Sequence, residues 1–347
     1  MSDQVAQGDN KSSDSAVQPW SIKTLIPQVS DAELKFSRGY LRCRPEKWFP
    51  GFGSQWLTLS HSLGTEFVCS SVKASLKLPE AGELCYGASI AGEMLGISFN
   101  QEAYDAIANI VSPGAAEAAR DVVVEYVVRR FLGSFALSWS GPELGEVDFH
   151  GRVAQETIGA LGSVTLALSA GGAMGSLHVL LGPKMVARMD GLWRRQVKST
   201  SSQNTQESMS LDYEIACLPL AADKVDQYLK KGTTLDLQVG ITDRIAIRIA
   251  NQDWLPGKLR LSHGNFTVEI LSGPLSTTEV PQGAKRLGVL LGSQLVAADD
   301  VRELAQVGAM IDTGIPAGDV VKLNLDDRFV ASGVLRTYDG RFVVTVA

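Results

Sequence analysis

The sequence predicts an α+β protein: a mixed α/β N-terminal region followed by two small β-rich modules that pair with each other. Three observations predict this fold. The last third of the 347-residue chain repeats itself at a fixed offset, and apolar residues alternate within each copy. A polar segment separates this repeat from a first half that has both helical and strand-like patterns.

The repeat aligns Ala221–Ile270 with Ala297–Val346 without a gap, at an offset of 76, with 13 identities in 50 positions. This period is too long for a solenoid unit and about right for one very small domain. Such a unit exposes strand edges and buries little surface, so it would be marginal alone. Two copies can cover each other's edges, and the repeat therefore predicts mutual pairing, inside the chain or between chains. The identical pairs include Gly232/Gly308, Asp243/Asp319, Gly257/Gly333, Arg260/Arg336, Gly264/Gly340 and Phe266/Phe342.

Each copy is predicted to begin with a short helix, Asp223–Lys230 or Asp299–Gln306, whose first aspartate is the expected N-cap. After Gly232 and Gly308 the apolar residues recur with period two, which is typical of half-buried strands. The alternating residues are Leu235, Leu237, Val239, Ile245, Ile247 and Ile249 in the first copy and Val321, Leu323 and Leu325 in the second.

Each copy is predicted to end in a β-hairpin. In the first copy, Lys258–Leu261 turns at Ser262–Asn265 into Phe266–Ile270, with Gly264 supplying a positive φ. In the second, Val334–Tyr338 turns at Asp339–Gly340, a strong hairpin signal, into Arg341–Val346. The matched Gly257 and Gly333 precede these hairpins, where we expect a bulge or tight bend.

The N-terminal region contains both element types. Helices are predicted over Gln101–Ile110 and Pro113–Leu132, the second with Ser112 as N-cap and Pro113 at its first position. A third helix, Pro183–Arg194, ends in a basic pair that suits the helix dipole. The apolar face of the second helix is predicted to contain Val122, Val123, Tyr126, Val127 and Phe131. The predicted strands are Phe135–Ser140, Ser163–Ser169 and Ser176–Leu181.

Two breaks in composition set the domain boundaries. Val197–Met209 is almost entirely small and polar, as in a flexible linker, and Ser272–Gly283 has the Gly, Pro and Thr content of a loop. The predicted division is a disordered tail (1–19), an N-terminal domain (20–196), a linker (197–210), a first module (211–272), a second linker (273–286) and a second module (287–347).

Bulk properties exclude several classes of function. The net charge of −6 argues against binding to nucleic acid or an anionic membrane surface. No apolar run reaches the roughly 18–20 residues of a membrane span, so no membrane insertion is expected. Met1–Val17 has neither the basic start nor the apolar core of a signal peptide. Cys43, Cys69, Cys85 and Cys217 have no CxxC spacing, which favours a cytosolic protein with reduced thiols.

The sequence nominates no catalytic residue, no cofactor-binding residue and no metal ligand, so no enzyme and no cofactor are predicted. The glycine-rich Ala170–Gly175 is followed by a strand and lacks GK[ST], which favours a hairpin turn over a phosphate loop. Ser60–His61 lacks the GxSxG context of a nucleophile. The histidines, which have no metal-ligand spacing, are His61, His150, His178 and His263.

Two groups of residues could have contacted a ligand or a partner. The matched Arg260 and Arg336 are predicted on the solvent face of a strand, where pairing with an acid on the next strand is favoured over ligand binding. Trp20, Trp48 and Trp254 could anchor partners, but a core or boundary position is favoured.

The repeated units resemble SpoA domains, the small intertwined β modules of flagellar switch and type III secretion ring proteins. The resemblance covers about Leu211–Leu271 and Gly288–Ala347. In the second copy it depends on five motifs in order: Leu290–Gly292, Arg302–Leu304, Gly318–Leu325, Phe329–Leu335 and Asp339–Val346.

Two such copies behind a divergent N-terminal domain resemble the SctQ (HrcQ, YscQ) family of the cytoplasmic ring, or sorting platform, of the type III secretion injectisome. The resemblance implies pairing of the two modules, self-association through the second module, and contact with the stator that regulates the secretion ATPase. It also implies contact with other ring and basal-body components, and a cytoplasmic location at the inner-membrane base. Some family members make a short C-terminal product, but no Met lies between Met209 and Met310 to start the second module alone.

Two alternatives remain open at this stage. A flagellar motor switch component (FliM/FliN type) is the nearer one, although Met1–Val17 lacks the apolar periodicity of a regulator-binding peptide. An unrelated enzyme with its catalytic site in Trp20–Gln196 is the other, and it would need a perturbed acid or thiol in a cleft there.

Overall fold

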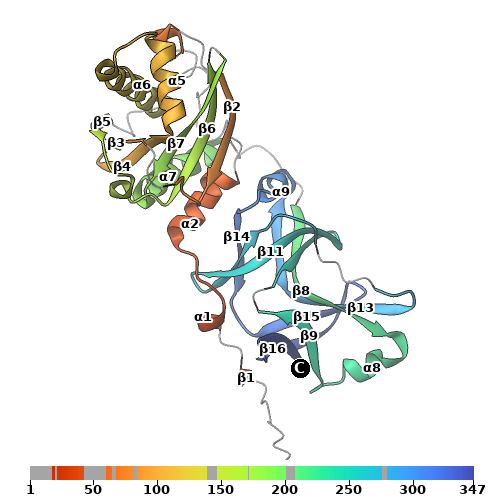
Figure 1. The fold of residues 1–347 in the computed structure, drawn as a ribbon. Helices are drawn as coiled ribbons and strands as arrows, with labels where there is room; N and C mark the ends of the chain where they lie inside the picture. Colours follow the sequence, from red (N-terminus) through yellow and green to blue (C-terminus); the bar gives the residue numbers. More distant parts are fainter. Residues whose placement is uncertain are drawn as a thin grey trace, which may run out of the picture.

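The computed structural model describes residues 18–19, 22–42, 60–64, 68–80, 84–138, 147–170, 172–200, 208–241, 243–275 and 280–347. The fold is α+β, as predicted, and Figure 1 shows two lobes. One lobe holds a six-stranded sheet with helices, and the other is built on an eleven-stranded sheet. The predicted tail lies outside the described residues except for Gln18–Pro19, which form the short strand β1.

The sheet of the N-terminal lobe is antiparallel throughout, with the order β2-β6-β7-β4-β3-β5. The predicted strands at 163–169 and 176–181 are confirmed as β6 and β7, and the predicted hairpin turn joins them, with Gly172 at φ +86°. The strands are β2 (Val68–Ser75), β3 (Leu84–Ile90), β4 (Glu93–Phe99), β5 (Val147–Arg152), β6 (Gly162–Ala170) and β7 (Ala173–Leu181).

The predicted helix at 101–110 is confirmed as α5 (Gln101–Val111), and the next helix, α6 (Glu117–Ser138), differs from its prediction at both ends. Ser112 is not an N-cap but the C-cap of α5, because Gly114 turns the chain with a φ of +77° before α6 begins. The strand predicted at 135–140 is also wrong for residues 135–138, which belong to α6, and residues 139 and 140 lie outside the described residues. Alternation over so few residues does not separate a strand from the end of a helix.

The buried face of α6 consists of Val124, Val127, Val128, Phe131, Leu132 and Phe135. Val122 and Tyr126 from the predicted face are instead exposed, at 69% and 47%. The helix packs against α5, β3 and β5. The predicted helix at 183–194 is confirmed as α7, which runs from Pro183 to Thr200 into the predicted linker, and β8 begins at Ser208.

The C-terminal lobe repeats its strands at the offset of the sequence repeat. Four of the five strand pairs keep the offset of 76 at both ends; the exception is β10 and β15, which differ by one residue at the start. The first copy has β8 (Ser208–Ala221), β9 (Thr234–Gly240), β10 (Ile245–Ile249), β11 (Gln252–Ser262) and β12 (Asn265–Ile270). The second has β13 (Ala284–Ala297), β14 (Met310–Pro316), β15 (Val320–Leu325), β16 (Arg328–Tyr338) and β17 (Arg341–Val346).

The two copies exchange strand contacts. The long strands β8 and β13 pair antiparallel from Ala221↔Ala284 to Ser208↔Ala297. The strand β9 of the first copy pairs with β17 of the second, and β14 of the second pairs with β12 of the first. Each copy therefore completes the sheet of the other, and Figure 1 shows the two sets of strands interleaved.

Short helices follow the central strands: η4 (Ala222–Lys224) and α8 (Val225–Tyr228) after β8, and α9 (Ala298–Leu304) after β13. The N-caps of η4, α8 and α9 are Ala221, Lys224 and Ala297, each without a side-chain cap. The predicted N-caps Asp223 and Asp299 are therefore wrong, because each lies inside the first turn. An acidic residue there still suits the positive end of the helix dipole.

Both predicted hairpins are confirmed, with His263–Gly264 and Asp339–Gly340 at positive φ between paired strands. The bulge or bend expected at the matched glycines is wrong, because the β11–β12 and β16–β17 ladders run through them without a register shift. A Cβ on Gly257 would lie 2.4 Å from Cγ1 of Val268, and one on Gly333 would lie 2.3 Å from Cγ1 of Val344. Close packing of a valine thus requires glycine at both positions.

The segment α1 (Ile22–Leu25), α2 (Asp31–Phe36) and η1 (Ser37–Leu41, a π-helical turn) joins the lobes. Arg38 pairs with the buried Asp190 of α7 at 2.9 Å in the N-terminal lobe. On the other side, Ser37 Oγ accepts a hydrogen bond from the backbone N–H of Met310 at 2.6 Å. The segment therefore contacts both lobes.

Candidate interaction surfaces

The first copy contains a buried charge cluster between β8, β10 and β13. The carboxylate of Glu214, 3% exposed, accepts from Arg286 at 2.5 Å and lies 3.5 Å from Arg248. Arg248 also donates to Asp253 at 2.9 Å and Asp327 at 2.7 Å. Burial raises the pKa of Glu214, and Arg286 opposes this shift. Because Arg286 and Asp327 belong to the second copy, the cluster connects the copies.

This cluster has no counterpart in the second copy. At the offset of 76, Glu214 matches Leu290, Arg248 matches Asn324 and Asp253 matches Phe329. The cluster does not follow from residues that match between the copies, because these positions differ. A usable signal is a charged residue of one copy that matches an apolar residue of the other at the offset of 76, as Glu214 matches Leu290.

A cavity of about 790 Å³ lies beside the cluster. Its size is in the range of small-molecule sites, but Glu214, Asp253 and Arg286 on its wall are already ion-paired. Burial raises the pKa of Cys217 on the same wall to about 11, so this thiol is protonated at neutral pH and a poor nucleophile. Arg244 and Lys258 complete the charged wall.

The equivalent face of the second copy has apolar residues at three positions that are charged in the first copy. Val320 is opposite Val334 across the β15–β16 ladder, and Phe329 is opposite Asn324. Residues directly opposite each other, and every second residue along a strand, share one face, so Val320, Val334 and Phe329 lie on the same face, with the pair Lys322↔Ser332 between them. Val320 and Phe329 are 64% and 61% exposed. We call these three residues the apolar face; their matches in the first copy are Arg244, Lys258 and Asp253.

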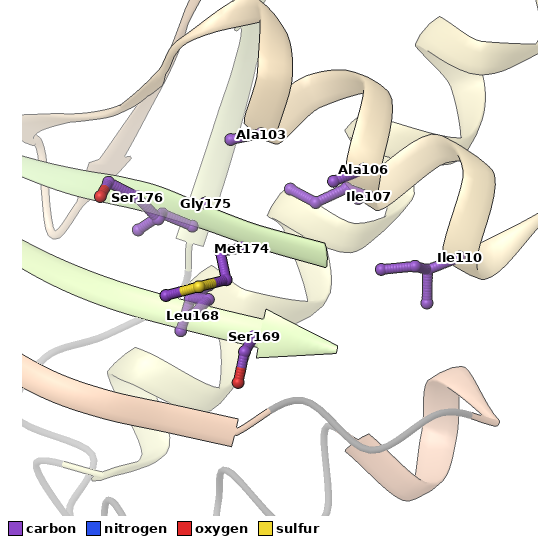
Figure 2. Close-up of a pocket in the computed structure, with 10 residues that line it drawn as sticks. Ala103, Ala106, Ile107, Ile110, Leu168, Ser169, Met174, Gly175 and Ser176 are labelled. Atoms are coloured by element: carbon purple, nitrogen blue, oxygen red, sulfur yellow. The ribbon is translucent and has the colours of Figure 1, made fainter. Parts of the chain in front are cut away.

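The N-terminal lobe has an apolar depression, shown in Figure 2. Ala103, Ile107 and Ile110 on α5 form one wall, and Leu168 and Met174 of the β6–β7 hairpin form the other. Its volume of about 20 Å³ is far below that of a small-molecule site. Met174 is 75% exposed at its rim. The depression can accept at most the tip of a partner's side chain.

The predicted arginine pairing is confirmed for Arg260, which contacts Glu269 at 2.5 Å. Arg336 is half-buried, and the position that matches Glu269 is Thr345, which has no charge. Trp254 packs against the core, whereas Trp20 and Trp48 lie outside the described residues.

The four histidines have separate surroundings in the structure. His150 contacts Ser89, His178 contacts Thr165, and His263 occupies the β11–β12 turn. His61 is exposed. Within the described ranges, no three His, Cys, Asp or Glu side chains are grouped as metal ligands would be. Cys69, Cys85 and Cys217 are not joined in disulfides with one another, and Cys43 lies outside those ranges. No described helix is long and apolar enough to cross a bilayer.

No protein-family model and no curated protein matches the sequence. Three solved structures are similar over about half of this chain. FliY from Thermotoga maritima is 13% identical with a TM-score of 0.35, over 48% of this chain and 98% of that one. The FliM middle domain from H. pylori is 14% identical with a TM-score of 0.34, over 47% and 99%.

The third similar structure is the FliM–SpeE complex from H. pylori. It is 12% identical with a TM-score of 0.33, over 47% of this chain and 97% of that one. All three TM-scores are below 0.5, so these similarities assign neither a fold family nor a function to this chain.

Proposed function

We propose that this chain is a non-catalytic structural component of the cytoplasmic ring, or sorting platform, of a bacterial type III secretion injectisome. In this proposal residues 211–272 and 287–347 are two SpoA-like modules, residues 20–196 are the N-terminal domain, and 197–210 and 273–286 are linkers. The chain works in the cytoplasm at the inner-membrane base of the apparatus.

The observation that carries the proposal is the exchange of strands between the copies. Because β9 of the first copy pairs with β17 and β14 of the second copy pairs with β12, the two copies form one unit whose outer surfaces remain available to partners. The sequence resemblance to SpoA modules supplies the biological setting. A paired β unit without a nominated catalytic group suits binding and assembly.

The partner surface in this proposal is the apolar face. Exposed valine and phenylalanine side chains on one sheet face are typical of docking sites, where burial of about 25 cal/mol per Å² of apolar surface stabilises a complex. The stator protein binds there and connects the ring to the secretion ATPase. Copies of the chain also associate with one another and with other ring or basal-body components.

The test is affinity purification of the tagged full-length chain from its native host, with quantitative mass spectrometry of the recovered proteins. We expect stator and ATPase proteins with the wild type and at least a tenfold loss with Val320→Asp, because a carboxylate in a dry interface is left unpaired. Val122→Asp is the matched control, since Val122 is equally exposed on α6. Equal recovery with both variants would refute the apolar face as the docking site.

The alternative is a flagellar motor switch component of the FliM/FliN type, which would use the same paired modules. The FliM and FliY names of the similar structures point to this alternative, but at TM-scores below 0.5 they do not favour it. The same purification separates the two assignments. Recovery of flagellar basal-body proteins, without stator or ATPase of the secretion system, would establish the alternative and overturn the proposal.

A further inference from the structure

The N-terminal arm, residues 18–19 and 22–29, runs along the paired copies and forms strand contacts with both. At its outer end, Gln18 pairs with Thr337 and Pro19 with Arg336, antiparallel on β16. At its inner end, Gln28 forms a parallel bridge with Leu261 on β11. There the Leu261 N–H donates to the Pro27 carbonyl at 3.0 Å, and its carbonyl accepts from Val29 at 2.8 Å.

The two contact points are equivalent positions of the repeat, because Leu261 and Thr337 are 76 residues apart. The neighbouring strand has ended at both points. The β10–β11 ladder ends at Ile245↔Gly257, and the β15–β16 ladder ends at Val320↔Val334. Beyond these pairs β11 and β16 each have an open edge, and open edges accept extended segments through backbone hydrogen bonds.

The arm is held more firmly at its inner end. Ile26 is 3% exposed and Val29 is 8% exposed, and Val29 packs with Leu34 and Met310. Among the described residues, the outer end pairs through Gln18 and Pro19, and proline has no N–H to donate. The outer end therefore separates at lower free energy than the inner end.

We propose that residues 18–19 of one copy of this chain pair with β16 of a second copy. The structure shows that this edge accepts this sequence, and every copy presents the same edge. Exchange then forms between chains the hydrogen bonds that it breaks within one, which makes it a low-cost route to association. The inference goes beyond the proposed function, since it requires only the arm and the edge of β16.

The helix α1 (Ile22–Leu25) gives the arm additional reach. A single helical turn has little stability of its own. Extending its four residues from about 1.5 Å to about 3.3 Å each lengthens the arm by roughly 7 Å. If the exchange is reciprocal, two copies close a two-fold dimer; if each arm passes to the next copy in turn, the contact is head-to-tail. A head-to-tail contact continues around a ring or along a filament.

The test uses the full chain as two single variants, Pro19→Cys and Arg336→Cys, with tags of different mass. The two are mixed and oxidised mildly, and linked peptides are identified by mass spectrometry, which separates this bond from bonds of native cysteines. We expect a disulfide that joins residue 19 of one copy to residue 336 of the other. The control replaces Arg336→Cys by Arg260→Cys, the equivalent first-copy position, and should link at least fivefold less.

The double variant Pro19→Cys/Arg336→Cys reports the contact within one chain. A 19–336 bond inside the double variant, with none between the mixed single variants at any protein concentration, would overturn the proposal. So would the absence of the bond in both samples. If either variant unfolds at a lower temperature than the wild type, Gln18→Cys with Thr337→Cys repeats the test at the adjacent pair.

Discussion

The two copies have the same backbone and different outer faces. Their strands match at the offset of 76, and their cores contain the same residues, such as Phe266 and Phe342. On the outer face, Arg244 and Asp253 of the first copy are replaced by Val320 and Phe329 of the second. The difference shows that the two copies agree at positions that pack inside and differ in charge on their outer faces. The first copy connects the pair by charges, and the second presents apolar surface.

The largest expected effect tests the equivalence of the two cores. Phe266→Ala and Phe342→Ala should each lower the free energy of unfolding by about 3–5 kcal/mol, because both rings are almost fully buried. Urea unfolding followed by circular dichroism measures this, with Val122→Ala as the exposed control. If only one of the two variants lowered the free energy of unfolding, the two cores would not be equivalent.

A smaller effect tests the close contacts at the matched glycines. Gly257→Ala and Gly333→Ala should each cost about 1–3 kcal/mol, because the added Cβ would overlap a buried valine. The matched variants Val268→Ala and Val344→Ala remove the overlapping atoms. In urea unfolding, each double variant should lose less stability than the sum of its two single variants. If the losses of stability were additive, the close contact with the valine would not be the reason for glycine at these two positions.

The smallest effect tests the charge cluster, which only the first copy has. Because burial raises the pKa of Glu214, the folded chain keeps this proton to a higher pH than the unfolded chain. The stabilisation from the protonated Glu214 is fully present below pH 4.5, the ordinary pKa of this carboxyl group, and is lost as the pH rises through the pKa of the folded chain. Glu214→Gln removes this dependence, so its urea midpoint should rise relative to the wild type from pH 4 to pH 7.

Asp326→Asn is the control of opposite sign for this pH series. Lys285 lowers the pKa of Asp326, so its stabilisation is present above the ordinary value of 3.8 and is lost as the pH falls through the folded pKa. The midpoint of Asp326→Asn should therefore fall relative to the wild type as the pH rises. If Glu214→Gln followed the same direction, the two arginines would outweigh the effect of burial.

Local signals in the sequence predicted the hairpins and most strands. Asp339–Gly340 and His263–Gly264 determine two-residue turns by their own backbone preferences, so neighbouring residues were enough. The alternation of Leu235 and Leu237 likewise gave a strand and its buried face. The capping box of Ser30 and Glu33, which begins α2, was also visible in the sequence but was missed.

The contacts between distant segments could not be predicted in this way. Glu214 and Arg286 meet only because β8 lies beside β13, and no pattern within either strand indicates that partner. The arm is a further case, since Gln18–Pro19 is too short to read as a strand until the edge of β16 is known. The apolar face also needed the β15–β16 register, which brings Val320 and Val334 together.

The reciprocal pairing of strands also has a consequence for biosynthesis. On the ribosome β9 is made before β17, yet it pairs with β17, and one edge of β12 stays unpaired until β14 is made. The first copy therefore cannot complete its folding while the second is still being translated, although domains usually fold in order of synthesis. Loop closure over these separations slows folding, so nascent chains expose unpaired strands for longer.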